Sequence, residues 1–166
     1  MLLGKVLASM GMLRGLNVTW MPSYGAEVRG GTAHSMVRIS SKPIASPVVS
    51  DTSAAIIMNS PSLDKFEERI VPGGLLILNA SMASRKVERD DIDIIAAPLT
   101  DEAIKLGNVR VANMIAAGIF TARKKIFDKK VLVSVIEEIA AGHKALLPIN
   151  IRAVEKGISL VRGEEK

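Results

Sequence analysis

One short segment gathers most of the side chains in this chain that could do chemistry. It joins a tyrosine, a glutamate, an arginine and a threonine to three glycines. The planar guanidinium of Arg29 can bind a phosphate or carboxylate through two parallel hydrogen bonds, and Glu27 can orient it or pair with a partner's arginine. The glycines allow the backbone to approach a ligand or another chain closely. We therefore predict a ligand or interface loop made of Tyr24, Gly25, Glu27, Arg29, Gly30, Gly31 and Thr32.

The same loop has a plainer interpretation, because glycines most often mark a turn. In that case Arg29 and Glu27 bridge each other and the glycines only reverse the chain. His34 follows the loop and could carry a proton there, but a packed or surface role is favoured, since no catalytic or metal-binding group surrounds it. The other histidine, His143, lies far away in the sequence. We predict no catalytic residue and no metal site in this chain.

The elements that must position this loop follow from hydrophobic periodicity and from capping residues. Ser60 is the predicted N-cap of one helix, with Pro61 in its first turn, and Asp128 is the predicted N-cap of another. Residues 72–74, Pro-Gly-Gly, are predicted to turn the chain into a strand. Helices are predicted over residues 2–16, 61–70, 99–106, 108–125, 129–141 and 147–161, and strands over 17–21, 33–41, 53–59, 75–79 and 92–97.

This order of elements predicts the fold class. Strands that alternate with helices are typical of a parallel or mixed sheet covered by helices. We therefore predict a three-layer α/β/α, Rossmann-like fold with a helical C-terminal third, and a single domain over residues 1–166. The loop between the strands at 17–21 and 33–41 is expected at the end of a sheet, where open α/β sheets usually hold ligands.

Composition excludes several function classes. Hydrophobic residues make up 48% of the chain, but no uncharged apolar run reaches the roughly 18 residues that a membrane span needs. Lys5 interrupts the apolar N-terminal run and no cleavage site follows it, so we expect a cytoplasmic protein without membrane contact. Cysteine is absent, which removes disulfides, thiolate catalysis and cysteine-held iron–sulfur clusters from these residues.

The net charge of +5 is concentrated toward the N-terminal third. A basic end beside the glycine loop suits a polyanionic ligand or an acidic partner surface. Nucleic acid is not expected, because only three Phe, one Tyr and one Trp are present and no binding motif is found. A second basic cluster could dock an acidic protein such as ferredoxin, although a solvated helix end is the favoured interpretation. It consists of Arg123, Lys124, Lys125, Lys129 and Lys130.

The sequence around the loop resembles a known family. Residues 18–25, Val-Thr-Trp-Met-Pro-Ser-Tyr-Gly, and residues 27–33, Glu-Val-Arg-Gly-Gly-Thr-Ala, are similar to the gamma subunit of 2-oxoacid:ferredoxin oxidoreductases. The 2-oxoglutarate, pyruvate or 2-ketoisovalerate type is favoured, because indolepyruvate oxidoreductases tend to have Met-Ser-Gln or Met-Ala-Gln before Arg-Gly-Gly. Softer similarities follow at 106–108 (Leu-Gly-Asn), 113–114 (Asn-Met), 150–153 (Asn-Ile-Arg-Ala) and Gly157.

The resemblance implies a non-autonomous subunit of an oxidoreductase that decarboxylates a 2-oxoacid onto coenzyme A and passes electrons to ferredoxin. Expected partners are alpha and beta subunits, with or without a ferredoxin-like delta subunit, and ferredoxin. Thiamine diphosphate, Mg²⁺ and iron–sulfur clusters are expected on those partners, since this chain has no cysteine. Its own role would be structural, with the loop shaping the coenzyme A and active-site surroundings. The alternatives are an independent nucleotide- or CoA-binding module and a purely structural interface protein.

The start of the chain departs from the family pattern. Members usually begin with a short strand and a glycine-rich Gly-x-Gly-Gly-x-Gly turn, whereas this sequence begins within the helix predicted from Leu2. The resemblance thus implies an N-terminally shortened form that lacks this strand and turn. Intact-mass analysis of the protein from its native source checks this expectation, and a mass matching residues 1–166 would contradict it.

Overall fold

The structure is a computed structural model that describes residues 1–24, 33–142 and 144–164, with the backbone alone described for 162–164. The helices are α1 (Leu2–Leu13), α2 (Ser60–Phe66), α3 (Leu99–Lys105), α4 (Ala112–Lys124), α5 (Lys129–Ile139) and α6 (Leu147–Glu164). Short 3-10 turns are η1 (Glu67–Arg69), η2 (Val109–Val111) and η3 (Lys144–Leu146). The strands are β1 (Asn17–Ser23), β2 (His34–Ser40), β3 (Thr52–Ile57), β4 (Ile70–Asn79) and β5 (Asp93–Ala97).

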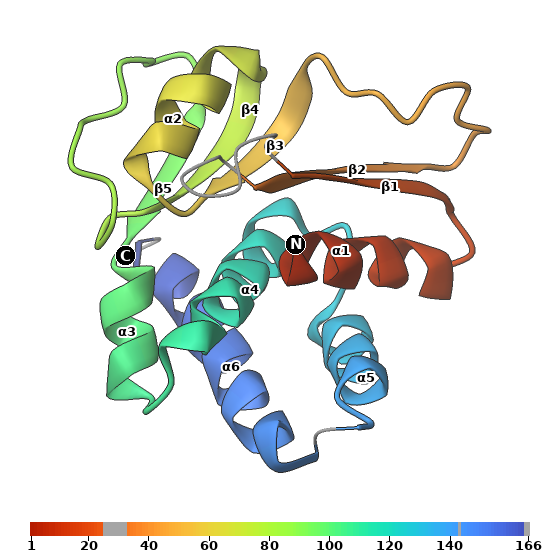
Figure 1. The fold of residues 1–166 in the computed structure, drawn as a ribbon, viewed down its shortest axis with the longest axis vertical. Helices are drawn as coiled ribbons and strands as arrows, with labels where there is room; N and C mark the ends of the chain where they lie inside the picture. Colours follow the sequence, from red (N-terminus) through yellow and green to blue (C-terminus); the bar gives the residue numbers. More distant parts are fainter. Residues whose placement is uncertain (25–32, 143, 165–166) are drawn as a thin grey trace.

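A parallel sheet with the strand order β3-β4-β5 forms the centre of the fold. Successive side chains of a strand point to opposite faces of the sheet. Leu75 and Ile77 of β4 therefore join one hydrophobic cluster with α4, whereas Leu76 and Leu78 join another with Leu63 of α2. In Figure 1, α2 lies on one side of the sheet, and α4 with the other C-terminal helices lies on the opposite side. The predicted α/β/α fold with a helical C-terminal third is confirmed.

The strands that flank the predicted loop form a separate two-stranded sheet. β1 and β2 pair in antiparallel register from Asn17 opposite Ser40 to Ser23 opposite His34. They are an antiparallel hairpin that packs beside α1 (Figure 1). The predicted loop therefore connects the ends of this small antiparallel sheet, which does not pair with the parallel strands. Each of the two strands forms its hydrogen bonds with the strand next to it in the sequence. The hairpin therefore forms without pairing with the parallel strands.

Two local predictions need correction. Asn59, not Ser60, is the N-cap of α2, because its side chain accepts a hydrogen bond from the backbone N–H of Ser62. The Pro-Gly-Gly segment at 72–74 lies inside β4 rather than forming a turn before it. Gly73 takes a positive φ of 71° and its N–H donates to the carbonyl oxygen of Asp91 at 2.8 Å. The pairing of β3 with β4 shifts register at this segment.

The C-terminal helices form the layer beneath the sheet. Asp128 caps α5 as predicted, with its Oδ1 accepting from the N–H of Val131 at 2.9 Å. α4 and α6 cross where Gly118 meets the backbone of Val154 and Gly157 meets that of Ile115. α4 is covered on several sides, and most of its residues from Ala112 to Thr121 are buried. Within the described residues, no helix has both the length and the apolar character needed to cross a membrane.

Candidate functional site

The hairpin end carries the loop predicted from the sequence. Of its seven residues, only Tyr24 belongs to the described part of the chain, and Tyr24 is 72% exposed. The other six, Gly25, Glu27, Arg29, Gly30, Gly31 and Thr32, lie outside the described residues. The structure therefore defines the surroundings from which the loop departs, at Ser23 and His34, rather than the geometry of the loop.

Helix α1 packs very closely against one face of the hairpin. A Cβ on Gly4 would lie 2.1 Å from Ser35 Oγ and 3.1 Å from Trp20 Nε1. A Cβ on Gly11 would lie 2.7 Å from Val18 Cγ2. Both glycines are buried, so the helix backbone itself is the surface on which the strands rest. This close packing fixes where the hairpin end sits relative to α1.

On the opposite face of the hairpin, an aromatic and cationic group of side chains lies beside the start of β2. The rings of His34 and Phe66 are tilted by 56° with their centroids 4.8 Å apart. Lys65 Nζ lies 5.4 Å from the centroid of the Phe66 ring, and Arg69 Cζ lies 5.5 Å from it. We call His34, Lys65, Phe66 and Arg69 the hairpin-end cluster.

The hairpin-end cluster combines two cations with an aromatic face. Cations over a ring are attracted by its negative face, and their charge raises the local potential for an anionic ligand or partner. His34 packs as the sequence favoured, on the face opposite Ser35, and its Nδ1 is buried without a hydrogen-bond partner among the described residues. The arrangement can bind an anion or stack on a planar group, but it offers no nucleophile paired with a base.

Sequence reasoning missed three of these four residues. The four-residue spacing of Lys65 and Arg69 in a predicted helix places both cations on one face, which is the signal that could have found them. The contact between Phe66 and His34 joins two elements far apart in sequence, and no local pattern predicts it. Phe66 reads in the sequence simply as a core residue of an amphipathic helix.

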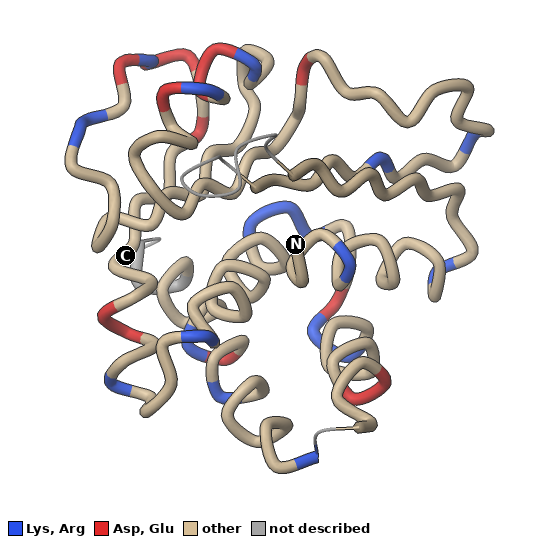
Figure 2. Tube along the Cα trace, viewed as in Figure 1, with Lys and Arg blue, Asp and Glu red and all other residues tan. Residues whose placement is uncertain are grey.

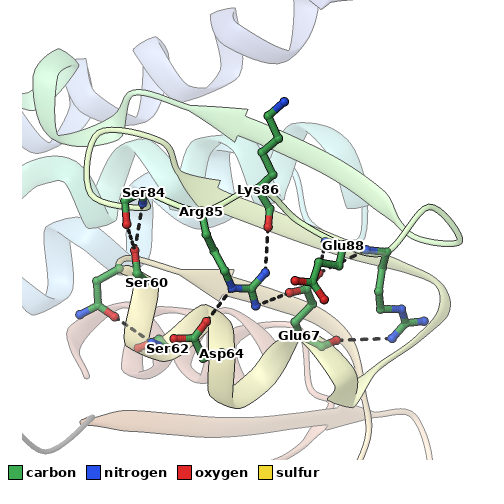
Figure 3. Close-up of polar contacts among 10 residues, drawn as sticks. Ser60, Ser62, Asp64, Glu67, Ser84, Arg85, Lys86 and Glu88 are labelled. Atoms are coloured by element: carbon green, nitrogen blue, oxygen red, sulfur yellow. Dashed lines mark hydrogen bonds and ion pairs between the residues drawn. The ribbon is translucent and has the colours of Figure 1, made fainter.

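An ion-pair network centred on the buried Glu67 holds the segment that carries this cluster. Glu67 is 2% exposed, and its carboxylate is paired with the guanidinium of Arg85, which also donates to Asp64 at 2.6 Å. Figure 3 shows Arg85 between Asp64 and Glu67, with Glu88 alongside. The backbone N–H of Glu88 donates to Glu67 Oε1 at 2.7 Å. The network ties the 80–92 connection to α2 and η1.

The protonation of Glu67 reflects these contacts. Burial alone would raise the pKa of the Glu67 carboxyl, but the hydrogen bond from Arg85 and those from the N–H groups of Glu88 and Arg89 outweigh it. The pKa therefore lies below its ordinary value. The pKa of Arg85 is raised by its hydrogen bonds to Asp64 and Glu67, so both partners stay charged at neutral pH. This is a structural network, because its charged groups are occupied by each other.

The carboxyl edge of the parallel sheet is closed by hydrogen bonds of its own. Asn79 is 1% exposed and its Nδ2 donates to the carbonyl oxygen of Met58 at 3.2 Å and to Thr100 Oγ1 at 2.8 Å. Its Oδ1 accepts from the N–H of Thr100 at 3.2 Å. Ser81 Oγ accepts from the N–H of Asp101 at 3.2 Å. The side chains at this edge join β3 and β4 to α3, although such edges usually bind ligands.

The second basic cluster lies at the connection between α4 and α5, as its sequence position indicates. Arg123 makes a two-pronged contact with Asp93, at 2.7 Å and 2.9 Å. Lys129 pairs with Glu155 at 2.7 Å. Within the part of the chain that the structure describes, two of its five cations are therefore engaged. This agrees with the favoured interpretation of a largely solvated helix end. Among the described residues no group of three His, Asp or Glu side chains could hold a metal ion.

Comparison with known proteins identifies the family. The model for the pyruvate ferredoxin/flavodoxin oxidoreductase family matches residues 1–160. The ketoisovalerate oxidoreductase subunit VorA of Methanothermobacter thermautotrophicus is 29% identical over 161 residues, covering 96% of this chain and 33% of VorA. The 2-oxoglutarate synthase subunit KorC of Methanocaldococcus jannaschii is 28% identical over 145 residues, covering 84% of this chain and 75% of KorC. This chain thus spans about a third of the length of the VorA relative.

Solved structures share the fold. The gamma subunit of a keto/oxoacid ferredoxin oxidoreductase from Geobacter sulfurreducens superposes with a TM-score of 0.82 at 20% identity, covering 98% of this chain and 90% of that one. The 2-oxoglutarate:ferredoxin oxidoreductase of Magnetococcus marinus, solved with 2-oxoglutarate, coenzyme A and succinyl-CoA, gives 0.83 at 20% identity, covering 98% of this chain and 29% of that one. With the family model matching nearly the whole chain, including its glycine loop, the protein belongs to the pyruvate ferredoxin/flavodoxin oxidoreductase family.

Proposed function

We propose that this chain is the gamma-type subunit of a 2-oxoacid:ferredoxin oxidoreductase and is not catalytic alone. The observation that carries the proposal is the family match over residues 1–160, which includes the loop at 24–32. The match to 75% of KorC and to 90% of a gamma subunit supports this assignment. The longer VorA shows that the same unit also occurs as part of a larger polypeptide.

The chemistry of the chain supports a division of labour. It has no cysteine for iron–sulfur clusters, and among the described residues no group of three carboxylate or histidine side chains could hold Mg²⁺. These residues therefore do not fit the metal and redox groups of such an enzyme. Thiamine diphosphate, Mg²⁺ and the clusters are assigned to alpha, beta and ferredoxin-like partner subunits, and ferredoxin is the proposed electron acceptor.

The proposed contribution of this chain is the loop at the hairpin end. Arg29, Glu27 and Tyr24, with the glycines beside them, would contact coenzyme A or the active-site surroundings on a partner subunit. Two observations support this. The loop departs from strands that α1 holds firmly, and Lys65 and Arg69 of the hairpin-end cluster add positive charge close to its base. A phosphate-bearing ligand suits such a potential.

Two other functions remain as alternatives to test. An independent nucleotide- or CoA-binding module predicts that the isolated chain binds coenzyme A by itself. A purely structural interface protein predicts stable assembly without any effect of loop substitutions on coenzyme A. Isothermal titration of the isolated chain with coenzyme A separates the first alternative from the proposal, which expects no measurable binding without partners.

Anaerobic affinity purification from the native source at low salt tests the subunit assignment. We expect cysteine-rich subunits to co-purify, and the assembly to reduce a viologen dye with a 2-oxoacid only when coenzyme A is present. Mass spectrometry identifies the subunits, and a panel of 2-oxoglutarate, pyruvate and 2-ketoisovalerate identifies the substrate. A chain that purifies alone and inactive would contradict the proposal.

The loop assignment predicts a specific kinetic effect of Arg29→Ala in the assembled complex. Loss of one charge-assisted hydrogen bond, about 1.5 to 3 kcal/mol, should lower kcat/KM for coenzyme A by roughly 10-fold to 100-fold. Lys42→Ala is the matched control, since it removes an exposed cation beyond the other end of β2 and should leave the kinetics unchanged. Normal assembly with unchanged coenzyme A kinetics in Arg29→Ala would refute a ligand role.

A further inference from the structure

A tight turn joins α3 to η2. Gly107 takes a positive φ of 98°, and its N–H donates to the carbonyl oxygen of Ile104 at 2.8 Å. Asn108 Oδ1 accepts from the N–H of Arg110 at 3.0 Å, so Asn108 caps η2. Residues 106–108, Leu-Gly-Asn, are one of the softer similarities found in the sequence, and they end α3 and start η2. The turn thus fixes how the two elements meet.

Two large apolar side chains beside this turn are exposed. Ile104 is 59% exposed and Val109 is 53% exposed. Their neighbours Ala103 and Val111 are buried in the larger hydrophobic cluster, so both elements already pack against the protein through other residues. Single exposed apolar residues are common, but a pair on two packed elements forms a small apolar patch of the kind found at the centre of protein contacts.

Four cations lie on the same elements and on α6. Lys105 and Lys156 both pair with Glu102, at 2.6 Å and 2.9 Å, and this contact joins α3 to α6. Arg110 and Arg152 are exposed, and neither guanidinium forms an ion pair with a described residue. Figure 2 shows Lys and Arg at the end of α3, on η2 and along α6. We call Ile104, Lys105, Val109, Arg110, Arg152 and Lys156 the α3–α6 face.

Carboxylates compensate this charge only in part. Besides Glu102, the carboxylates described on α3 and α6 are Asp101 and Glu155. Glu155 pairs with Lys129 of α5 at 2.7 Å, and Asp101 lies in the first turn of α3. The four cations are thus met by two carboxylates that are not engaged elsewhere. The α3–α6 face keeps an excess of positive charge around an apolar patch.

We propose that the α3–α6 face binds an acidic surface of a partner subunit. The proposal rests on the proposed function, in which the chain works only within an assembly. Ile104 and Val109 form the apolar centre of the contact, and Arg110 and Arg152 pair with carboxylates of the partner. Charge selects this partner over a second copy of the chain, because two copies of one basic face repel each other. The hairpin and its loop take no part in this contact.

A competition experiment in the native source tests this surface. A tagged variant and an untagged wild-type chain are co-expressed, and quantitative mass spectrometry measures how much partner subunit each one carries at low salt. We expect Arg110→Glu and Arg152→Glu each to weaken assembly by roughly 3-fold to 10-fold, because each reverses a charge that faces carboxylates. Raising the salt concentration should reduce the difference from the wild type. Ile104→Ser should weaken assembly about 5-fold at any salt concentration, because it removes apolar contact area.

The chain offers a matched control for each substitution. Lys42→Glu reverses an exposed charge beyond the end of β2, and Val48→Ser removes an apolar side chain that is 59% exposed, as Ile104 is. Both controls should compete as well as the tagged wild type. Circular dichroism and urea unfolding of the isolated chains verify that every variant is folded. Lys105 and Lys156 are left unchanged, because their pairing with Glu102 holds α3 on α6.

The outcomes separate this inference from the proposed function. If the tagged wild type retrieves no cysteine-rich subunits, the proposed function fails and this contact fails with it. If the wild type retrieves them and the three variants retrieve as much, the proposed function stands and the contact is refuted. Variants that assemble normally but reduce ferredoxin poorly, with unchanged reduction of a viologen dye, would also refute it, because the face would then dock the electron carrier.

Discussion

At the scale of single residues, two glycines determine how closely the longest helices approach. A Cβ on Gly157 would lie 2.0 Å from the carbonyl oxygen of Ile115, and one on Gly118 would lie 2.2 Å from that of Val154. Both obstacles are backbone atoms, which cannot rotate away as a side chain can. α4 and α6 therefore pack backbone against backbone at this crossing, which lies in the larger hydrophobic cluster.

Gly157→Ala should consequently destabilise the protein despite the better helix propensity of alanine. The propensity gain of about 1 kcal/mol is outweighed by the clash, and we expect a net loss of about 2 kcal/mol or more in the free energy of unfolding. Urea denaturation followed by circular dichroism measures it. Gly142→Ala is the control, since a Cβ there meets nothing within 4 Å. Equal stability of the two variants would show that the helices separate at little cost.

Single residues also show which structural features can be predicted from the sequence. Asp128 was predicted as an N-cap because the capping pattern is local, and the structure confirms it. Gly157 stood out by resemblance alone, and its reason is the contact with Ile115, which no pattern within α6 encodes. Gly118 had no signal at all. A close approach between two helices depends on both of them, so it is visible only once their crossing is known.

At the scale of elements, the connection from β4 to β5 is held on α2 by one buried carboxylate. Glu67 receives hydrogen bonds from Arg85 and from the backbone of Glu88 and Arg89. Arg89 adds a contact from its guanidinium to the carbonyl oxygen of Glu67 at 3.4 Å. Residues 80–92 have no regular strand or helix of their own, so these side chains add to the few backbone hydrogen bonds that hold the segment.

This network predicts how stability depends on pH. The pKa of Glu67 is lowered in the folded chain, so its contribution is present above the ordinary value near 4.5 and is lost as the pH falls through the folded value. Without Arg85, burial is opposed only by the backbone hydrogen bonds from Glu88 and Arg89, so the pKa of Glu67 is lowered less. Arg85→Gln should thus lower the urea midpoint clearly at pH 7 and progressively less toward pH 3. Lys86→Gln, whose side chain points away from Glu67 in Figure 3, should shift it little at any pH. A pH-independent effect of Arg85→Gln would contradict this role for the pair.

Element boundaries show where local signals compete with tertiary contacts. The Pro-Gly-Gly segment carries a strong turn signal, yet it continues β4 because Gly73 finds a hydrogen-bond acceptor in Asp91, on the connection leading into β5. Asn59 and Ser60 are both good caps, and the sequence alone does not say which one starts α2. The strands around the glycine loop were located correctly, but their pairing into a separate hairpin depends on partners that periodicity does not specify.

At the scale of the whole molecule, the two hydrophobic clusters share the central strand β4. β4 is paired on both sides, and its faces contribute to the two hydrophobic clusters through Leu75 and Ile77 on one side and Leu76 and Leu78 on the other. All four side chains are at most 4% exposed. Alternation of helices and strands was enough to predict these layers. That residues 1–166 form a single domain stays a prediction.

Native-state hydrogen exchange can test the central position of β4. We expect the amides of Leu75 to Leu78 to exchange only through global unfolding, because opening them disrupts both clusters. Their exchange free energy should equal the unfolding free energy from urea denaturation. Amides of the hairpin are the internal comparison and should exchange through smaller openings. Faster exchange in β4 than in α4 would show that the two faces of the sheet open separately.

The unequal burial of Glu67 and Arg85 has a consequence for how the sequence can change. The Glu67 side chain is 3% exposed and that of Arg85 is 31% exposed. If Arg85 is replaced first, a carboxylate stays buried with only backbone N–H groups as partners, and that intermediate is unstable. If Glu67 is replaced first, Arg85 keeps Asp64 at 2.6 Å and stays partly hydrated. Divergence at this pair should therefore follow one order, with the glutamate lost before the arginine.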